Sequence, residues 1–83
     1  MSMPKTLEIL YFASLAEQAR KDEEKIQFAG EDLTDLYQIL SKKYGFTLTQ
    51  VKLAVAINHE MTRWDTPIND GDIIAFIPPV AGG

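Results

Sequence analysis

The stretch Asp72-Ile73-Ile74-Ala75-Phe76-Ile77 decides the fold, because every residue after its first is apolar. A short run that is apolar on both faces is typical of a strand at the centre of a sheet, where both faces are covered. One face would carry Ile73, Ala75 and Ile77, and the other Ile74 and Phe76. The residues just before it, Asn69-Asp70-Gly71, are typical of a tight turn. We therefore expect a sheet built around a strand near the C-terminus.

Alternating apolar residues predict the remaining strands. They cover Thr6–Phe12, Lys25–Phe28, Lys52–Ile57 and Glu60–Trp64, with a hairpin turn at Asn58-His59 between the last two. In the first strand, Leu7, Ile9 and Tyr11 share one face, opposite Leu10 and Phe12. The alternation alone leaves open which of these two faces meets the core.

One long helix is predicted over Leu33–Tyr44, where apolar residues recur at helical spacing. Asp32 is expected to cap its start and Gly45 its end. Ser14 and Glu17 match a capping box, which predicts a short helix from Ser14 to about Arg20. The expected class is α+β, with a mixed five-stranded sheet packed on one main helix plus a short helix.

Composition excludes several classes of function. The 83 residues carry a net charge of -4, so they lack the basic surface that nucleic-acid binding needs. The longest uncharged stretch, Ile73–Gly83, is too short and too rich in proline to span a membrane, and Met1–Lys5 does not resemble a signal peptide. We therefore expect a cytoplasmic protein that contacts neither nucleic acid nor membrane.

Residues suited to catalysis or metal binding are scarce. The chain has no cysteine, and its single histidine, His59, lies in a predicted turn. No phosphate-binding glycine loop or nucleophile motif is present in the sequence. The chain is therefore expected to bind no metal or cofactor and to have no self-contained active site.

The most unusual feature is the C-terminus. Pro78 and Pro79 favour an extended conformation that leaves the sheet, and Val80, Ala81, Gly82 and Gly83 follow. We interpret residues 1–77 as the folded domain and residues 78–83 as an extended, flexible tail. Six extended residues reach roughly 20 Å, enough to enter another protein's active site. A terminus without side chains suits activation of its carboxylate by ATP. The alternative is a frayed end without function.

The chain resembles the ubiquitin-like sulfur carriers of the MoaD/ThiS family, and within it the small subunits of molybdopterin synthase. The resemblance lies in three segments: Ile9-Leu10-Tyr11-Phe12-Ala13-Ser14-Leu15, Asn69-Asp70-Gly71-Asp72 and Ala75–Gly83. It covers nearly the whole chain and implies the β-grasp fold. Tyr11 and Ile77 depart slightly, since the family often has phenylalanine at these positions.

The resemblance implies that Gly83 is adenylated by a ubiquitin-activating-like adenylyltransferase and then thiocarboxylated, with a sulfurtransferase as sulfur source. The tail, Pro78 to Gly82, would insert into the large synthase subunit, where the sulfur passes to cyclic pyranopterin monophosphate. The small subunit would be a non-catalytic sulfur donor in a heterotetramer of two small and two large subunits. A thiamine-type sulfur carrier and a ubiquitin-like protein modifier remain alternatives, as does a plain interaction domain. The paired prolines favour the molybdopterin carrier over the thiamine type.

The resemblance also implies a docking surface beside the tail, at positions matching Phe12, Met61, Phe76 and Ile77. Such a surface agrees with the pattern of the strands. The last strand is apolar on both faces, whereas the chain offers only one long helix to cover the sheet. The alternative is that these side chains belong to the core, above all Ile77.

Overall fold

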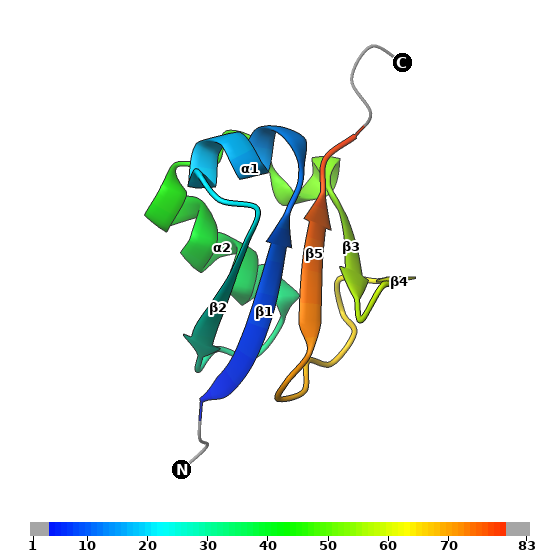
Figure 1. The fold of residues 1–83 in the computed structure, drawn as a ribbon. Helices are drawn as coiled ribbons and strands as arrows, with labels where there is room; N and C mark the ends of the chain where they lie inside the picture. Colours follow the sequence, from blue (N-terminus) through cyan, green and yellow to red (C-terminus); the bar gives the residue numbers. More distant parts are fainter. Residues whose placement is uncertain (1–3, 80–83) are drawn as a thin grey trace.

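The structure is a computed structural model that describes residues 4–79. It contains five strands, two α-helices and one short 3₁₀ helix (Figure 1). The elements in chain order are β1 (Lys5–Tyr11), α1 (Ala13–Ala19), β2 (Glu23–Phe28), α2 (Leu33–Tyr44), η1 (Gln50–Lys52), β3 (Ala54–Ile57), β4 (Glu60–Thr62) and β5 (Ile73–Ile77).

The strands form one mixed sheet in the order β2-β1-β5-β3-β4, so the predicted central strand, β5, does lie in the middle. It pairs in parallel with β1 and antiparallel with β3. The first strand of the chain and the last thus lie side by side, as Figure 1 shows in blue and orange. Their pairing closes the fold between residues more than sixty positions apart in the sequence.

Helix α2 covers one face of the sheet and encloses the core. Its buried residues are Leu33, Leu36, Tyr37 and Leu40. They recur at the helical spacing from which the helix was predicted. The Asp32 carboxylate accepts a hydrogen bond from the Asp35 amide at 2.9 Å, so the predicted N-cap is confirmed. Gly45 ends the helix with a φ of 71°, a left-handed conformation that glycine adopts without a steric penalty.

The same face of β1 and β5 completes the core. Leu7, Ile9 and Tyr11 are buried under the helices, as are Ile74 and Phe76. This answers the question that alternation left open: the odd-numbered residues of β1 point inward, and Leu10 points outward with Ala75.

Several predicted boundaries are wrong by one or two residues. Phe12 lies outside β1, β2 begins at Glu23 rather than Lys25, and β4 ends at Thr62 rather than Trp64. Lys52 belongs to η1, and β3 begins only at Ala54. The alternation of apolar residues continues past the ends of these strands, but the chain leaves the sheet where the next turn begins.

The predicted capping box is also wrong. The N-cap of α1 is Phe12, whose side chain makes no capping hydrogen bond, and Ser14 lies inside the helix. The helix is held instead by its buried residues Leu15 and Ala19. Packing of one apolar side thus determines where this short helix forms.

The sheet face opposite α2 carries no helix in the described part of the chain (Figure 1). On β5 this face carries Ile73, Ala75 and Ile77, of which the two isoleucines are only half-buried. The expectation that both faces of the last strand are covered therefore holds for the helix side alone.

Candidate functional site

A row of apolar residues crosses the uncovered face of the sheet. Strand register places Leu10 beside Ala75, Ala75 beside Ala56, and Ala56 beside Met61. We call these four residues the outer row. The two alanines are small and buried by their neighbours, while the Met61 side chain is 62% exposed. The row therefore has two small residues at its centre, the half-buried Leu10 at one end and the exposed, flexible Met61 at the other.

A groove lies next to the outer row, where β1 ends and the tail begins. It has a volume of about 930 Å³ and is lined mainly by apolar side chains. The lining residues are Phe12, Ala13, Ser14, Glu17, Leu48, Ile77, Pro78 and Pro79. We call this groove the tail-root groove, because Pro78 and Pro79, the first two residues of the predicted tail, line it.

The four residues predicted to dock a partner differ in their exposure to solvent. Phe12 is 46% exposed and lines the tail-root groove, and Met61 ends the outer row. Ile77 is half-buried on the same face, paired with Ala54. These three side chains are placed where a partner can reach them, and their role in docking stays a prediction.

Phe76 is wrong as a docking residue. Its side chain is 0% exposed and packs against Tyr37 and Trp64, with ring centroids 5.3 and 5.8 Å away. The cause is strand parity, since Phe76 and Ile77 are neighbours and must point to opposite faces. Phe76 belongs to the core under α2.

Pro78 and Pro79 are the last residues of the tail that the structure describes. Val80, Ala81, Gly82 and Gly83 lie outside the described residues, so their predicted roles, and the tail boundary with its predicted flexibility, remain predictions.

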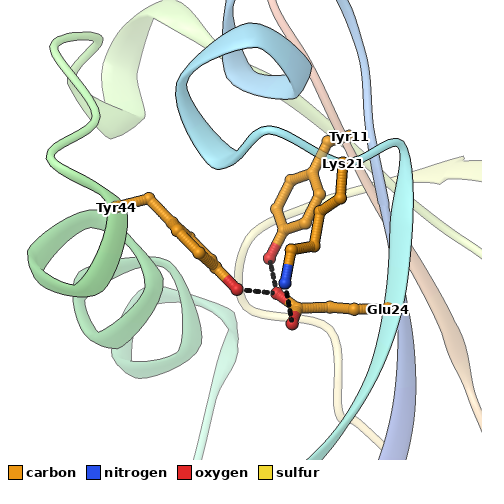
Figure 2. Close-up of polar contacts among 4 residues, drawn as sticks. All are labelled: Tyr11, Lys21, Glu24 and Tyr44. Carbon is orange, nitrogen blue, oxygen red and sulfur yellow. Dashed lines mark hydrogen bonds and ion pairs between the residues drawn. The ribbon is translucent and has the colours of Figure 1, made fainter.

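The structure also contains a polar cluster that the sequence does not predict. The Glu24 carboxylate accepts hydrogen bonds from the hydroxyls of Tyr11 at 2.5 Å and Tyr44 at 2.6 Å (Figure 2). Lys21 approaches the same carboxylate at 3.4 Å. We call these four residues the Glu24 cluster. It joins the end of β1, the start of β2 and the end of α2, which are far apart in the sequence.

The Glu24 cluster perturbs the titration of its members. Partial burial disfavours the charged form of Glu24, but hydrogen bonds from Tyr11 and Tyr44 and the charge of Lys21 outweigh it and lower its pKa. Burial, with the neighbouring Glu24 charge, raises the pKa of Tyr11. The pKa of Lys21 is raised by its contacts with Tyr44 and Glu24. These shifts stabilise the cluster with Glu24 ionised and Tyr11 neutral.

The Glu24 cluster gives position 11 a polar role. The hydroxyl of Tyr11, which a phenylalanine would lack, donates to Glu24. The sequence did contain a signal, since Tyr11 and Tyr44 each place a polar atom at the end of an otherwise apolar stripe. Nothing in the local pattern marked Glu24 as their partner.

Neither a metal-binding cluster nor a membrane-spanning helix occurs among residues 4–79. Within that range, no three side chains of histidine, aspartate or glutamate converge in a way that could hold a metal ion. None of the helices described there is long and apolar enough to cross a membrane.

The arrangement of strands and helices defines the class first: this is a ubiquitin-like β-grasp protein. A family model described as the ThiS family matches residues 9–83. The chain therefore belongs to the ThiS/MoaD family.

Named relatives match along almost their whole length. The molybdopterin synthase sulfur carrier subunit of Escherichia coli (strain K12) is 31% identical over 80 residues, which are 93% of this chain and 99% of that protein. The subunit of the same name from Haemophilus influenzae is 34% identical, also over 80 residues, with the same coverage.

Two solved structures extend the comparison. One is a complex of subunits 1 and 2 of the molybdopterin-converting factor from Helicobacter pylori, with 30% identity and a TM-score of 0.65, covering 94% of this chain and 99% of that one. The other is SAMP1 from Haloferax volcanii, with 25% identity, a TM-score of 0.74 and the same coverage.

Proposed function

We propose that this protein is the sulfur carrier subunit of a molybdopterin synthase. The observation that carries the proposal is a combination of two features of one chain. An uncovered apolar sheet face meets the root of a Gly-Gly tail, and full-length relatives are named as molybdopterin synthase sulfur carriers.

The chemistry would take place at the Gly83 carboxylate, and partner enzymes would supply the ATP site and the sulfur. The terminal carboxylate attacks the α-phosphate of ATP bound by an adenylyltransferase, and pyrophosphate leaves. The outer sulfur of a persulfide on a sulfurtransferase then displaces AMP to give an acyl disulfide, and a thiol cleaves its S–S bond, which releases the terminal thiocarboxylate and leaves the thiol as a disulfide. A final glycine suits both attacks, because no side chain obstructs the carbonyl carbon. The carrier itself holds no cofactor.

The second stage would require the large synthase subunit, in a heterotetramer of two small and two large subunits. The tail delivers the thiocarboxylate to cyclic pyranopterin monophosphate in that subunit's active site. The outer row and the tail-root groove are suited to bury apolar surface against the partner, which would fix the start of the tail at the entrance. Substrate binding and proton transfer fall to the large subunit.

The direct test is the intact mass of the carrier after co-expression with its adenylyltransferase and sulfurtransferase. Replacement of the terminal OH by SH adds about 16 Da, and one such increment is expected. Deleting Gly83, or adding one residue after it, should abolish the increment and leave the thermal midpoint unchanged. Sulfur transfer at the wild-type rate by the deletion variant would contradict the proposal.

The docking role is tested separately with Phe12→Asp and Met61→Asp. Both residues are exposed, Phe12 by 46% and Met61 by 62%. Each variant should therefore keep its thermal midpoint and assemble with the large subunit at least tenfold more weakly, where tenfold corresponds to about 1.4 kcal/mol. A collapsed midpoint with normal assembly of the folded fraction would place both residues in the core.

A protein-modifier function is the second candidate. It is favoured by the similarity to SAMP1, whose name stands for small archaeal modifier protein 1. The tail chemistry would be shared, and only the acceptor differs. A modifier predicts an isopeptide-linked conjugate that survives reducing, denaturing electrophoresis, whereas a carrier predicts the thiocarboxylate alone. A thiamine-type carrier would restore thiamine synthesis, and not molybdoenzyme activity, in a strain that lacks the native carrier.

A further inference from the structure

Ala13 has an unusual backbone conformation at the edge of the tail-root groove. Its φ is 52°, in the left-handed region that non-glycine residues rarely adopt. Ala13 is exposed, so no packing of its own side chain explains the conformation. Backbone strain of this kind persists where the surrounding structure demands it.

The left-handed backbone at Ala13 is imposed by two buried residues on either side of it. Tyr11 ends β1 with its side chain in the core, and Leu15 is fully buried beneath α1. Only three residues separate them, and in that length the chain changes from strand to helix. The Leu15 amide donates to the carbonyl of Phe12 at 3.1 Å, which closes the turn around Ala13.

The consequence falls on Phe12. Its backbone is extended, with φ −128° and ψ 149°, and its side chain is 46% exposed at the groove. The direction of a residue this exposed depends on the backbone that carries it. The turn at Ala13 fixes the direction in which the chain presents Phe12.

The other end of α1 offers a contrast. Arg20 is also left-handed, with φ 62°, but its amide donates to the carbonyl of Ala16, as is common where a helix ends. The conformation of Arg20 is thus explained by the helix terminus. No such rule explains a left-handed residue at a helix start.

We propose that Ala13 is a positioning residue for partner assembly: its left-handed backbone holds Phe12 in the docking direction before the partner binds. A backbone that already presents Phe12 in one direction loses less conformational entropy on association. The inference rests on the proposed function, since it assumes that Phe12 contacts the large synthase subunit.

The experiment compares valine with glycine at position 13. Valine is branched at Cβ and resists a positive φ, whereas glycine accepts it freely. With the large subunit from the same organism, Ala13→Val should assemble at least about tenfold more weakly than Ala13→Gly. Arg20→Val and Arg20→Gly form the matched control, because they alter the same backbone feature away from the groove. These two should assemble alike.

A double-mutant cycle separates positioning from general damage. In a Phe12→Ala background, the difference between valine and glycine at position 13 should fall below about twofold. A difference that persists in this background, or equal assembly of Ala13→Val and Ala13→Gly, overturns the inference. Failure of the wild-type chain to assemble would instead contradict the proposed function.

The wild-type protein provides a readout that does not depend on the folding of any variant. NMR relaxation should give the Phe12 amide an order parameter near the rigid value of about 0.85 in the free carrier. A value below about 0.6 would mean that the turn does not hold Phe12, and would overturn the inference whatever the variants do.

Discussion

Glu24 illustrates how one side chain can join several distant segments. Its carboxylate accepts hydrogen bonds from the hydroxyls of Tyr11 and Tyr44 and lies near the Lys21 ammonium. These contacts connect the edge strand β2 to the end of α2. Hydrogen bonds to a charged acceptor are stronger than neutral ones, particularly where water is partly excluded. The Glu24 cluster therefore contributes to stability through its charge state.

The free energy of unfolding should depend on pH in a way set by the Glu24 cluster. The pKa of Glu24 is lowered from 4.5, so its contribution is present above that pH and is lost as the pH falls through the folded-state value. The pKa of Tyr11 is raised from 10.0, so its contribution is present below pH 10.0 and is lost as the pH rises further. Urea unfolding measured across pH should show a plateau between these limits.

Two variants assign the limbs of this profile. Glu24→Gln should flatten the acid limb relative to the wild type, since no carboxylate remains to be protonated. Tyr11→Phe should cost about 1.5–3 kcal/mol at neutral pH, because it removes a hydrogen bond to a charged group. An unchanged acid limb in Glu24→Gln would mean that other carboxylates determine acid unfolding.

Truncation to alanine should lower the free energy of unfolding strongly at Phe76 and hardly at all at Met61. Phe76→Ala removes a fully buried ring and should lower the free energy of unfolding by about 3–5 kcal/mol. Met61→Ala, on the exposed end of the outer row, should change it by no more than about 0.5 kcal/mol. Chemical denaturation of both variants checks the assignment of Phe76 to the core and Met61 to the surface.

At the scale of elements, the two helices are stabilised in different ways. Helix α2 has a side-chain cap at its start, lysines in its last turn that favour the helix dipole, and glycine at its end. Helix α1 has seven residues, no side-chain cap and left-handed residues at both ends. The longer helix follows from local rules, and the shorter one depends on Leu15 and Ala19 packing onto the sheet.

Capping substitutions should expose this difference. Asp32→Ala should cost about 1 kcal/mol, the typical value for loss of an N-cap. Ser14→Ala should leave stability within about 0.5 kcal/mol, since Ser14 does not cap α1. Thermal unfolding of the two variants provides the test. Equal losses would mean that Ser14 contributes to α1 in another way.

At the scale of the whole molecule, the fold and the tail have separate tasks. The five strands and two α-helices found among residues 4–79 lie within residues 5–77, and the parallel pairing of β1 with β5 closes the structure. The direction of β5 then carries the chain to the tail-root groove. The domain determines where the tail begins, and the proposed chemistry belongs to the last residue.

Truncation should separate these tasks. A chain that ends at Pro79 retains every element of the sheet and should unfold at the wild-type temperature. The same chain should gain no thiocarboxylate and transfer no sulfur in a reconstituted synthase. Circular dichroism and intact mass measure the two properties independently. A large drop in the thermal midpoint would show that residues 80–83 contribute to the folded domain.

Much of the fold was predictable because its signals are local. The apolar run in β5, the spacing in α2, the caps at Asp32 and Gly45, and the turn at Asn58-His59 each depend on residues close in sequence. Backbone conformation, side-chain period and capping act over a few residues, so the pattern alone carries them. The tail at residues 78–83 stays a prediction from composition.

The tertiary structure decided what depends on distant residues. Alternation separates the two faces of a strand, but only the position of α2 shows that Phe76 is inside and the outer row outside. Glu24 meets Tyr44 across 20 positions, and the left-handed turn at Ala13 is imposed by anchors on either side of it. Such contacts follow from how elements pack, and packing is a property of the whole chain rather than of any local stretch.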